Sequence, residues 1–431
     1  MGIEKILELG KIYRAIGPLS IKIVNGEAFT LGFIAKVGEK IVVPRTRTVV
    51  IKPLVKTTID LIIGVEGVFE EARPEEEVIE EWLTVSEAVV KEAKVKERCY
   101  KVVILGGVDV GKSSLSAFLS NFCLERGFKV AVIDGDIGQA DIGPPSCVSL
   151  AFVNKRIISL RELSPYSMRF IGIDSPGTVK HLVIWALHSL LDDALDYSAE
   201  FVIINTDGWI SGPGAKDYKL ALIQALNPDA IIAIQRSNEL EHILKPLEWR
   251  KIFKVNAPKA AKRIPFEERK SLREAGYFRF LKNSKIRTFK NIPLMYCYTF
   301  SGVPLPEEIL NRISEILGVT VIYGEISPEH LLVLVEEDVT GLSEKVKSLK
   351  KTFNVGIVRI LERGTESGFL VGLLNDGVRC AGIGLLENID YRSHVVKVRT
   401  PYEGDVAVIA VGRIKLSEDG REVCKFRAPF I

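Results

Sequence analysis

The sequence of 431 residues contains few cysteines, and none of them are spaced as metal-binding or redox pairs are. The six lie far apart along the chain: Cys99, Cys123, Cys147, Cys297, Cys380 and Cys424. Because no two have the Cys-x-x-Cys spacing, we expect neither a structural zinc site nor a thioredoxin-like motif. Scattered thiols in a large chain are typical of a reducing compartment, so we expect a cytoplasmic protein.

Long hydrophobic segments are also lacking. Residues 1–13 are charged and contain no apolar core of the length found in signal peptides. Nowhere does an uninterrupted apolar run reach about 18 residues, the length that crosses a bilayer. We therefore expect no membrane partner.

The chain has no overall excess of charge of one sign, but its charge is unevenly distributed. It has 58 Lys and Arg against 55 Asp and Glu, a net charge of +3, and 47% hydrophobic residues, which excludes disorder as the main state. Residues 250–290 alone hold 14 basic residues against three acids, a net charge of +11, which leaves −8 for the rest. We expect this basic lid to bind anions. A solvated helical hairpin is the alternative.

Changes in residue pattern along the chain predict four segments. Short Val-, Ile- and Thr-rich runs separated by turn residues predict an N-terminal β domain over 1–73. A run of glutamates after Pro74 predicts an acidic linker helix over 74–99 that begins at this proline and exposes its acids to solvent. A nucleotide-binding α/β domain is predicted over 100–300, and a C-terminal β-rich domain over 301–431.

The α/β prediction depends on continuous apolar runs separated by helical stretches. Such runs indicate strands buried on both faces of a doubly wound parallel sheet. They occur at residues 101–105, 129–134, 169–173, 200–205 and 229–234. The sequence thus predicts a central parallel sheet flanked by the two β-rich domains.

The strongest motif joins the first of these strands to a helix predicted over residues 112–126. Residues 106–113 match the pattern G-x-x-x-x-G-K-[ST], and a buried strand followed by a helix is the context in which this pattern binds phosphates. Backbone amides would surround the β-phosphate, Lys112 would reach the β- and γ-phosphates, and Ser113 would bind Mg²⁺. We predict ATP as the nucleotide. Its predicted contacts are Gly106, Gly107, Val108, Asp109, Val110, Gly111, Lys112, Ser113 and Ser114.

Acidic residues follow the second strand. Asp134 and Asp136 lie where the carboxyl end of that strand meets the crevice in which such sheets bind ligands. Phosphoryl transfer to an alcohol requires that the reacting hydroxyl group lose its proton. One of the two carboxylates can accept this proton while the other binds Mg²⁺. Capping of the next turn is an alternative role for Asp134.

Three later segments leave more than one interpretation open. Asp174 and Ser175 follow a strand and would lie near the metal, or would form a turn with the next two residues. Trp209, on a loop after another strand, would stack on a nucleobase or fold back onto the core. Arg269 and Arg273 are four residues apart, so on a helix both would project from one face and could close over a triphosphate.

Taken together, these motifs resemble the polynucleotide 5′-hydroxyl kinases, a family that includes a subunit of the messenger-RNA cleavage and polyadenylation machinery and the nucleolar ribosomal-RNA kinases. The resemblance rests on residues 106–113, 134–139, 175–177 and 206–209, and on Arg269-x-x-x-Arg273. It implies an N-terminal β domain, a central P-loop kinase domain and a C-terminal β-rich domain. It also implies an RNA or DNA 5′-hydroxyl end as substrate, and RNA-processing proteins as partners.

The resemblance further implies roles for individual residues. Asp136 would be the general base and, with Ser113, a magnesium ligand. The terminal nucleotide would be held by Gln139, Thr206, Gly208 and Trp209. Lys112, Arg269 and Arg273 would stabilise the transferred phosphoryl group. The alternative is a scaffold or assembly NTPase that binds ATP or GTP without transferring phosphate to an oligonucleotide.

Overall fold

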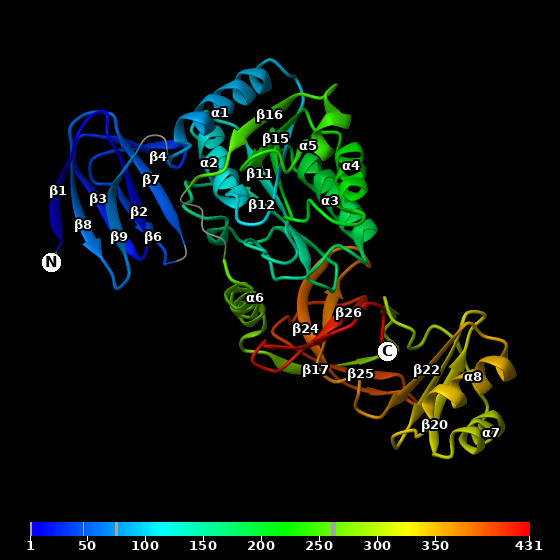
Figure 1. Ribbon diagram of the computed structural model, residues 1–431. Helices are drawn as coiled ribbons and strands as arrows, with labels where there is room; N and C mark the ends of the chain where they lie inside the picture. Colours follow the sequence, from blue (N-terminus) through cyan, green and yellow to red (C-terminus); the bar gives the residue numbers. More distant parts are fainter. Residues whose placement is uncertain (1, 46, 74–75, 260–263) are drawn as a thin grey trace. The chain divides into compact units, whose positions relative to one another are not determined.

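The computed structural model describes residues 2–45, 47–73, 76–259 and 264–431 (Figure 1). The chain divides into two compact units. The first unit consists of Met1–Gly143, Val148–Met168 and Val179–Arg269. The second consists of Pro144–Cys147, Arg169–Thr178 and Lys270–Ile431. Among the described residues, no helix is long and apolar enough to cross a membrane.

The first unit begins with two antiparallel sheets. One has the strand order β1-β8-β3-β6 and the other β5-β4-β7-β2-β9. Their bounds are β1 Ile3–Leu7, β2 Ile12–Ile16, β3 Leu19–Asn25, β4 Ala28–Thr30, β5 Phe33–Ala35, β6 Lys40–Val43, β7 Thr48–Pro53, β8 Thr57–Ile63 and β9 Val68–Ala72. Alternate side chains of both sheets, such as Ile21, Ile59, Tyr13 and Ile51, form one shared core. This alternation of buried and exposed residues is the pattern that an antiparallel β sandwich requires.

A seven-stranded sheet forms the centre of the first unit. Its strand order is β13-β12-β11-β14-β10-β15-β16. The strands are β10 Tyr100–Gly106, β11 Val130–Gly135, β12 Cys147–Val153, β13 Ser167–Phe170, β14 Phe201–Thr206, β15 Ala230–Gln235 and β16 Ile252–Asn256. The order places β10 between β14 and β15, so the segments that follow β11, β14, β10 and β15 emerge side by side at one edge.

Helices cover both faces of this sheet (Figure 1). Those of the unit are α1 Ile79–Lys94, α2 Lys112–Leu124, α3 Lys180–Asp196, α4 Ala215–Leu226 and α5 Glu241–Leu244. Trp82 of α1 and Phe118 of α2 pack in one core with Val102 and Ile203 of the strands. Helices α3, α4 and α5 lie on the other side. The α/β architecture with several sheets agrees with the sequence.

One feature of the predicted sheet is wrong. The sheet is mixed, because β12 pairs antiparallel with β11 while β10, β11, β14, β15 and β16 pair in parallel. Strand β12 is not among the predicted strands, and the strand predicted over 169–173 corresponds to β13, which ends at Phe170. An antiparallel neighbour needs no crossover helix, so the pattern of alternating strands and helices does not reveal it.

The glutamate run before α1 is also placed differently from the prediction. Helix α1 begins at Ile79, and Pro74 and Glu75 lie outside the described residues. Glu76 and Glu77 are not on a solvated helix face, since both bind the guanidinium of Arg14, with Glu77 almost completely buried. These acids therefore connect the N-terminal sheets to the segment that leads into α1.

The second unit contains a mixed sheet and a smaller sheet covered by helices. The larger sheet has the order β17-β25-β24-β23-β26-β18, with β27 paired to β26, and the smaller one β19-β20-β21-β22. Strand bounds are β17 Lys285–Lys290, β18 Leu294–Met295, β19 Val303–Pro304, β20 Val321–Ile326, β21 His330–Val335, β22 Ile357–Glu362, β23 Phe369–Leu374, β24 Cys380–Asp390, β25 Val395–Thr400, β26 Val408–Leu416 and β27 Glu422–Lys425. Helices α7 Glu307–Leu317 and α8 Leu342–Phe353 pack with the smaller sheet around Leu331 and Val333.

The basic segment 250–290 is not a helical hairpin. It forms β16, helix α6 Phe266–Leu281 and β17, and residues 260–263 lie outside the described residues. Several of its cations pair with acids outside the segment, as Lys251 does with Glu92 and Lys254 with Glu241. Counting acids within the segment therefore overestimates its unpaired charge.

Candidate active site

The phosphate-binding loop lies between β10 and α2, at the edge where the central strands end. Gly106 closes β10 and cannot carry a side chain, because a Cβ there would lie 2.7 Å from Val110 Cγ2 and 2.9 Å from Ile234 O. Gly111 has a φ of +101°, a conformation that L-residues rarely adopt. Val110 is buried beneath the loop, whereas Val108 is exposed at its tip. The loop thus presents mainly backbone atoms, together with the uncapped N-terminus of α2, to an anion.

Lys112 is the first residue of α2 and is buried. Its Nζ donates a hydrogen bond to Gly107 O at 2.6 Å. Burial lowers the pKa of Lys112, and the negative charge of Asp136 acts in the opposite direction. A cation in this position is directed into the concave side of the loop, where phosphate oxygens bind in P-loop proteins.

Ser113 and Asp134 are connected by Asn205, a residue that the sequence analysis did not single out. Asn205 Nδ2 donates to Asp134 Oδ1 at 3.0 Å and lies 3.5 Å from Ser113 Oγ. Asp134 Oδ2 accepts hydrogen bonds from the backbone N–H groups of Asp141 and Ile142, so Asp134 does cap the following turn. Burial, with the charges of Asp141 and Asp136, raises the pKa of Asp134 to about 7.

The oxygen atoms gathered here fit a magnesium ion. Asn205 Oδ1 is buried and accepts no hydrogen bond from the described part of the chain, and Ser113 Oγ and the two aspartates lie nearby. Hard oxygen donors of this kind suit Mg²⁺. Within the described ranges, no three His, Cys, Asp or Glu side chains could hold a metal by themselves.

Asp136 uses one carboxylate oxygen for a turn and leaves the other available. Its Oδ1 accepts from the backbone N–H groups of Gly138 and Gln139 at 3.1 and 2.9 Å. Its Oδ2 accepts no hydrogen bond from any residue that the structure describes, and the side chain is partly exposed. Burial raises the pKa of Asp136, while the charge of Lys112 opposes this shift. The free oxygen of a fixed carboxylate can accept a proton from a bound hydroxyl group.

The segment that follows β14 packs directly on the phosphate loop. A Cβ at Gly208 would lie 2.6 Å from Val108 Cγ2, and one at Gly107 would lie 3.3 Å from Ile210 Cδ1. Thr206 is buried, and its hydroxyl donates to Ile104 O at 2.8 Å, so it holds the strand and is not directed toward a ligand. Trp209 is partly exposed and stacks on Tyr218, with ring centroids 5.6 Å apart.

A buried network that the sequence analysis missed fixes this segment. Asp207 Oδ1 accepts from Trp209 N at 2.9 Å, and its Oδ2 accepts from Tyr218 Oη at 2.7 Å and from Lys219 Nζ at 2.9 Å. Lys219 is completely buried, and it also donates to Asp207 O. The i, i+12 separation of Lys219 from Asp207 gives no sequence signal, although a polar run after a buried strand marks the region as functional.

Removing the carboxylate from this network should be strongly destabilising. In Asp207→Ala, Lys219 would be left as an unpaired buried cation, which costs about 3–5 kcal/mol. We expect this loss in the free energy of unfolding measured by denaturant titration, with most of it recovered when Lys219→Met is added. A loss below about 1 kcal/mol would show that the network does not hold the segment.

The N-terminal end of α6 lies against the phosphate loop. Arg269 Nη1 is 4.0 Å from Asp109 Oδ2, and Gln139 Nε2 donates to Arg269 O at 3.2 Å. Ile264 N also donates to Asp109, and Arg236 Nη2 donates to Asp109 O at 2.8 Å. Arg236, which follows β15, is a basic residue at the loop that the sequence analysis passed over. The structure thus brings Arg269, Gln139 and the phosphate loop together.

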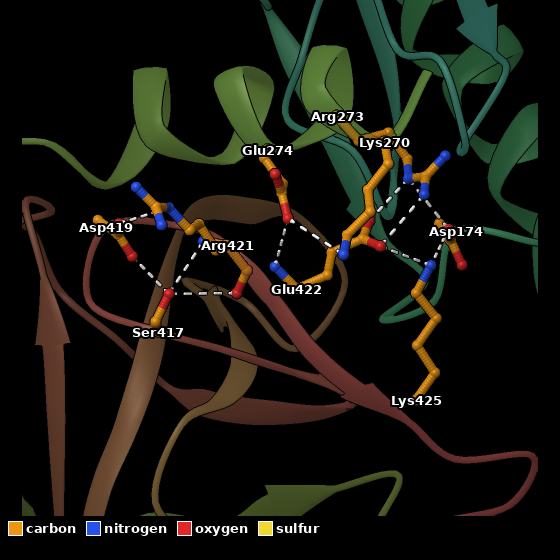
Figure 2. Close-up of polar contacts among 9 residues, drawn as sticks. All are labelled: Asp174, Lys270, Arg273, Glu274, Ser417, Asp419, Arg421, Glu422 and Lys425. Atoms are coloured by element: carbon orange, nitrogen blue, oxygen red, sulfur yellow. Dashed lines mark hydrogen bonds and ion pairs between the residues drawn. The ribbon is translucent and has the colours of Figure 1, made fainter. Parts of the chain in front are cut away.

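Arg273 has different surroundings, although it belongs to the same helix (Figure 2). Its Nε and Nη2 donate to Glu422 Oε1 and Oε2 at 2.7 and 3.1 Å, and its Nε is 3.2 Å from Asp174 Oδ2. Asp174 in turn pairs with Lys425 at 2.6 Å. The sequence left open whether Asp174 lies near the metal or forms a turn. In the structure its carboxylate pairs with this arginine and with Lys425, a role that neither interpretation included, and all four residues belong to the second unit.

The fold and this site together define a class: an α/β protein with a nucleotide-binding P-loop. Residues 106–283 match the family described as mRNA cleavage and polyadenylation factor CLP1 P-loop. The chain is 32% identical to polyribonucleotide 5′-hydroxyl-kinase MJ1315 of Methanocaldococcus jannaschii, over 77% of this chain and 91% of that protein. It is also 32% identical to polyribonucleotide 5′-hydroxyl-kinase PH0197 of Pyrococcus horikoshii, over 75% of this chain and 87% of that protein.

The chain therefore belongs to the polyribonucleotide 5′-hydroxyl-kinase family. A more distant relative is polynucleotide 5′-hydroxyl-kinase NOL9 of Mus musculus, 22% identical over 70% of this chain and 46% of that protein. Among solved structures, wild-type Clp1p in complex with Pcf11p has a TM-score of 0.62 at 11% identity, covering 96% of this chain and 98% of that chain. At this identity the likeness concerns the fold alone.

Proposed function

We propose that this protein is an enzyme that transfers the γ-phosphate of ATP to the 5′-hydroxyl group of RNA. The proposal depends above all on Asp136, whose Oδ2 accepts no hydrogen bond from the described residues. The charge of Asp136 interacts with that of Lys112 in an intact phosphate loop. The family relationship supports the proposal. Relatives that are 32% identical over most of both chains are named polyribonucleotide 5′-hydroxyl-kinases.

Each part of the site has a task in this reaction. The loop amides and Lys112 would hold the β- and γ-phosphates, and Asp136 Oδ2 would accept the proton of the attacking hydroxyl group. Ser113 and Asp136, with Asp134 and Asn205 around them, would hold Mg²⁺, which neutralises charge on the phosphates when it is bound. Arg269 would approach the transferred group from the side of Asp109.

The segment 206–209 would receive the terminal nucleotide. Thr206 and Gly208 would fix the backbone of this segment. Gln139, which donates a hydrogen bond to Arg269 O, would lie next to the nucleotide, and the ring of Trp209 would stack on its base. Action on DNA, and partners among RNA-processing proteins, remain predictions.

The test is transfer of labelled γ-phosphate to oligonucleotides of one sequence made as RNA and as DNA, each with a 5′-hydroxyl or a 5′-phosphate. We expect label on the 5′-hydroxyl RNA and none on the 5′-phosphate form, and loss of transfer when EDTA removes Mg²⁺. ATP hydrolysis without any transfer would indicate an NTPase of the scaffold type and contradict the proposal.

Replacing Trp209 should weaken substrate binding more than catalysis. Stacking of one base on an aromatic ring contributes about 1–3 kcal/mol, so Trp209→Ala should raise the KM for 5′-hydroxyl RNA by about 5- to 150-fold. Initial rates at varied RNA and ATP concentrations measure this, and the KM for ATP should not change. Trp249→Ala, at an exposed tryptophan over Arg250, is the matched control. Equal KM values for RNA in both variants would exclude Trp209 as the stacking surface.

A further inference from the structure

Arg269 and Arg273, two arginines of α6, differ in how completely carboxylates of the protein neutralise their charges. The Arg269 side chain is 28% exposed and lies 4.0 Å from one carboxylate oxygen of Asp109. The Arg273 side chain is 8% exposed and contacts two carboxylates, Glu422 through two nitrogens and Asp174 through Nε. A guanidinium that is enclosed and neutralised in this way is not available to phosphate oxygens unless both contacts break.

Further contacts hold the partners of Arg273 in place (Figure 2). Lys425 Nζ is 2.6 Å from Asp174 Oδ2 and 2.9 Å from Glu422 Oε2, so it bridges the two acids. The backbone N–H of Glu422 donates to Glu274 Oε1 at 2.9 Å, on the helical turn that carries Arg273. Burial lowers the pKa of Arg273, but the hydrogen bond to Glu422 and the charge of Asp174 outweigh it and raise the pKa.

Backbone packing joins the same two elements. Gly420, in the turn between β26 and β27, has a φ of +81°, and a Cβ there would lie 3.0 Å from Phe278 N. The turn thus approaches α6 closely one turn after Arg273. Salt bridges, a backbone hydrogen bond and this close approach together fix α6 to the β26–β27 hairpin.

We propose that Arg273 is a positioning residue and not a phosphate ligand: Glu422, Lys425 and Asp174 anchor it, and thereby fix the direction of the helix that carries Arg269. Arg269 lies one turn earlier on the same helix, so a restraint on Arg273 restricts where Arg269 points. Glu422 and Lys425 of the C-terminal domain then become necessary for phosphoryl transfer without touching the substrate. This inference rests on the proposed kinase activity.

A double-mutant cycle tests the proposal, using Arg273→Gln, Glu422→Gln and the double variant in the full-length protein. If Arg273 acts only by anchoring α6, each single change lowers kcat by about 10-fold, and the double variant is no slower than either one, because each removes the same restraint. Arg269→Gln should lower kcat by about 10²-fold or more in the otherwise unaltered protein. In the Arg273→Gln and Glu422→Gln backgrounds its further effect should be about tenfold smaller, because the anchor acts through Arg269.

The outcome expected of a phosphate ligand is different. Glu422→Gln would then leave kcat unchanged or raise it by freeing Arg273, while Arg273→Gln would lower kcat at least as much as Arg269→Gln does. Either result overturns the proposal. If the unaltered protein does not phosphorylate the oligonucleotide, the proposed function itself is contradicted.

Two controls separate positioning from general damage to the fold. Arg421→Gln changes a neighbouring exposed residue of the same hairpin, whose side chain pairs with Asp419, and should leave kcat unaltered. Binding of a fluorescent ATP analogue should remain within about twofold of the unaltered protein for Glu422→Gln, because the phosphate loop is intact. If Glu422→Gln does not fold, Asp174→Asn is measured in its place with the same two outcomes.

Discussion

Asp136→Asn should lower kcat for RNA phosphorylation by about 10²–10⁴-fold, the usual contribution of a general base. The amide keeps the shape of the side chain and an oxygen that can accept the hydrogen bonds of Gly138 and Gln139, so the turn should survive. What is lost is the basic Oδ2. The KM for ATP should change little, because the phosphate loop is untouched.

Single-turnover rates with excess enzyme measure this effect directly. Asp192→Asn is the matched control, since Asp192 is an exposed carboxylate on α3 that pairs with the exposed His188. A residual rate within about tenfold of the unaltered protein would mean that another group accepts the proton, and the assignment of Asp136 would be wrong.

Lys112→Met should abolish transfer while leaving the fold intact. Removing one fixed donor from a charge-stabilising site costs about 10²–10³-fold in kcat, and Lys112 would also contribute to ATP binding. Burial already opposes the charged form of Lys112, as the lowered pKa shows, so replacing it with an apolar side chain of similar length removes a buried charge. We therefore expect the thermal midpoint of the ligand-free protein to stay the same or rise.

This opposite response of activity and stability distinguishes a functional residue from a structural one. Lys216→Met, at an exposed position on α4, should change neither kcat nor the thermal midpoint. A Lys112→Met variant that loses stability together with activity would indicate that the lysine mainly supports the fold through Gly107.

The phosphate loop could be predicted from the sequence because all of its determinants are local. Two glycines, a lysine and a serine at fixed spacing between an apolar run and a helix define both the backbone path and the ligand. The place of Asp136 could be predicted for the same reason, because this residue directly follows β11. The contacts of Gly208 with Val108 could not be predicted, because they join segments that are about a hundred residues apart in sequence.

The contacts of the basic segment 250–290 could not be predicted from local sequence. Arg269 and Arg273 do lie on one helix, but their spacing does not show that the partner of Arg273 is Glu422, 149 residues further along the chain. The charge count of segment 250–290 fails for the same reason, since acids such as Glu92 and Glu241 come from other elements. Asn205 and Lys219 escaped notice because their importance lies in burial and in partners, which no motif records.

In the reaction that we propose, the γ-phosphate moves from ATP to the 5′-hydroxyl end of RNA with Asp136 as the base. The most direct measurement incubates γ-labelled ATP and Mg²⁺ with 5′-hydroxyl RNA, digests the product to nucleoside 5′-phosphates and identifies the labelled nucleotide. We predict that all label is recovered on the 5′-terminal nucleotide with the unaltered protein, and almost none is transferred by Asp136→Asn. Label elsewhere in the RNA, label only as free phosphate, or full transfer by Asp136→Asn would contradict the account.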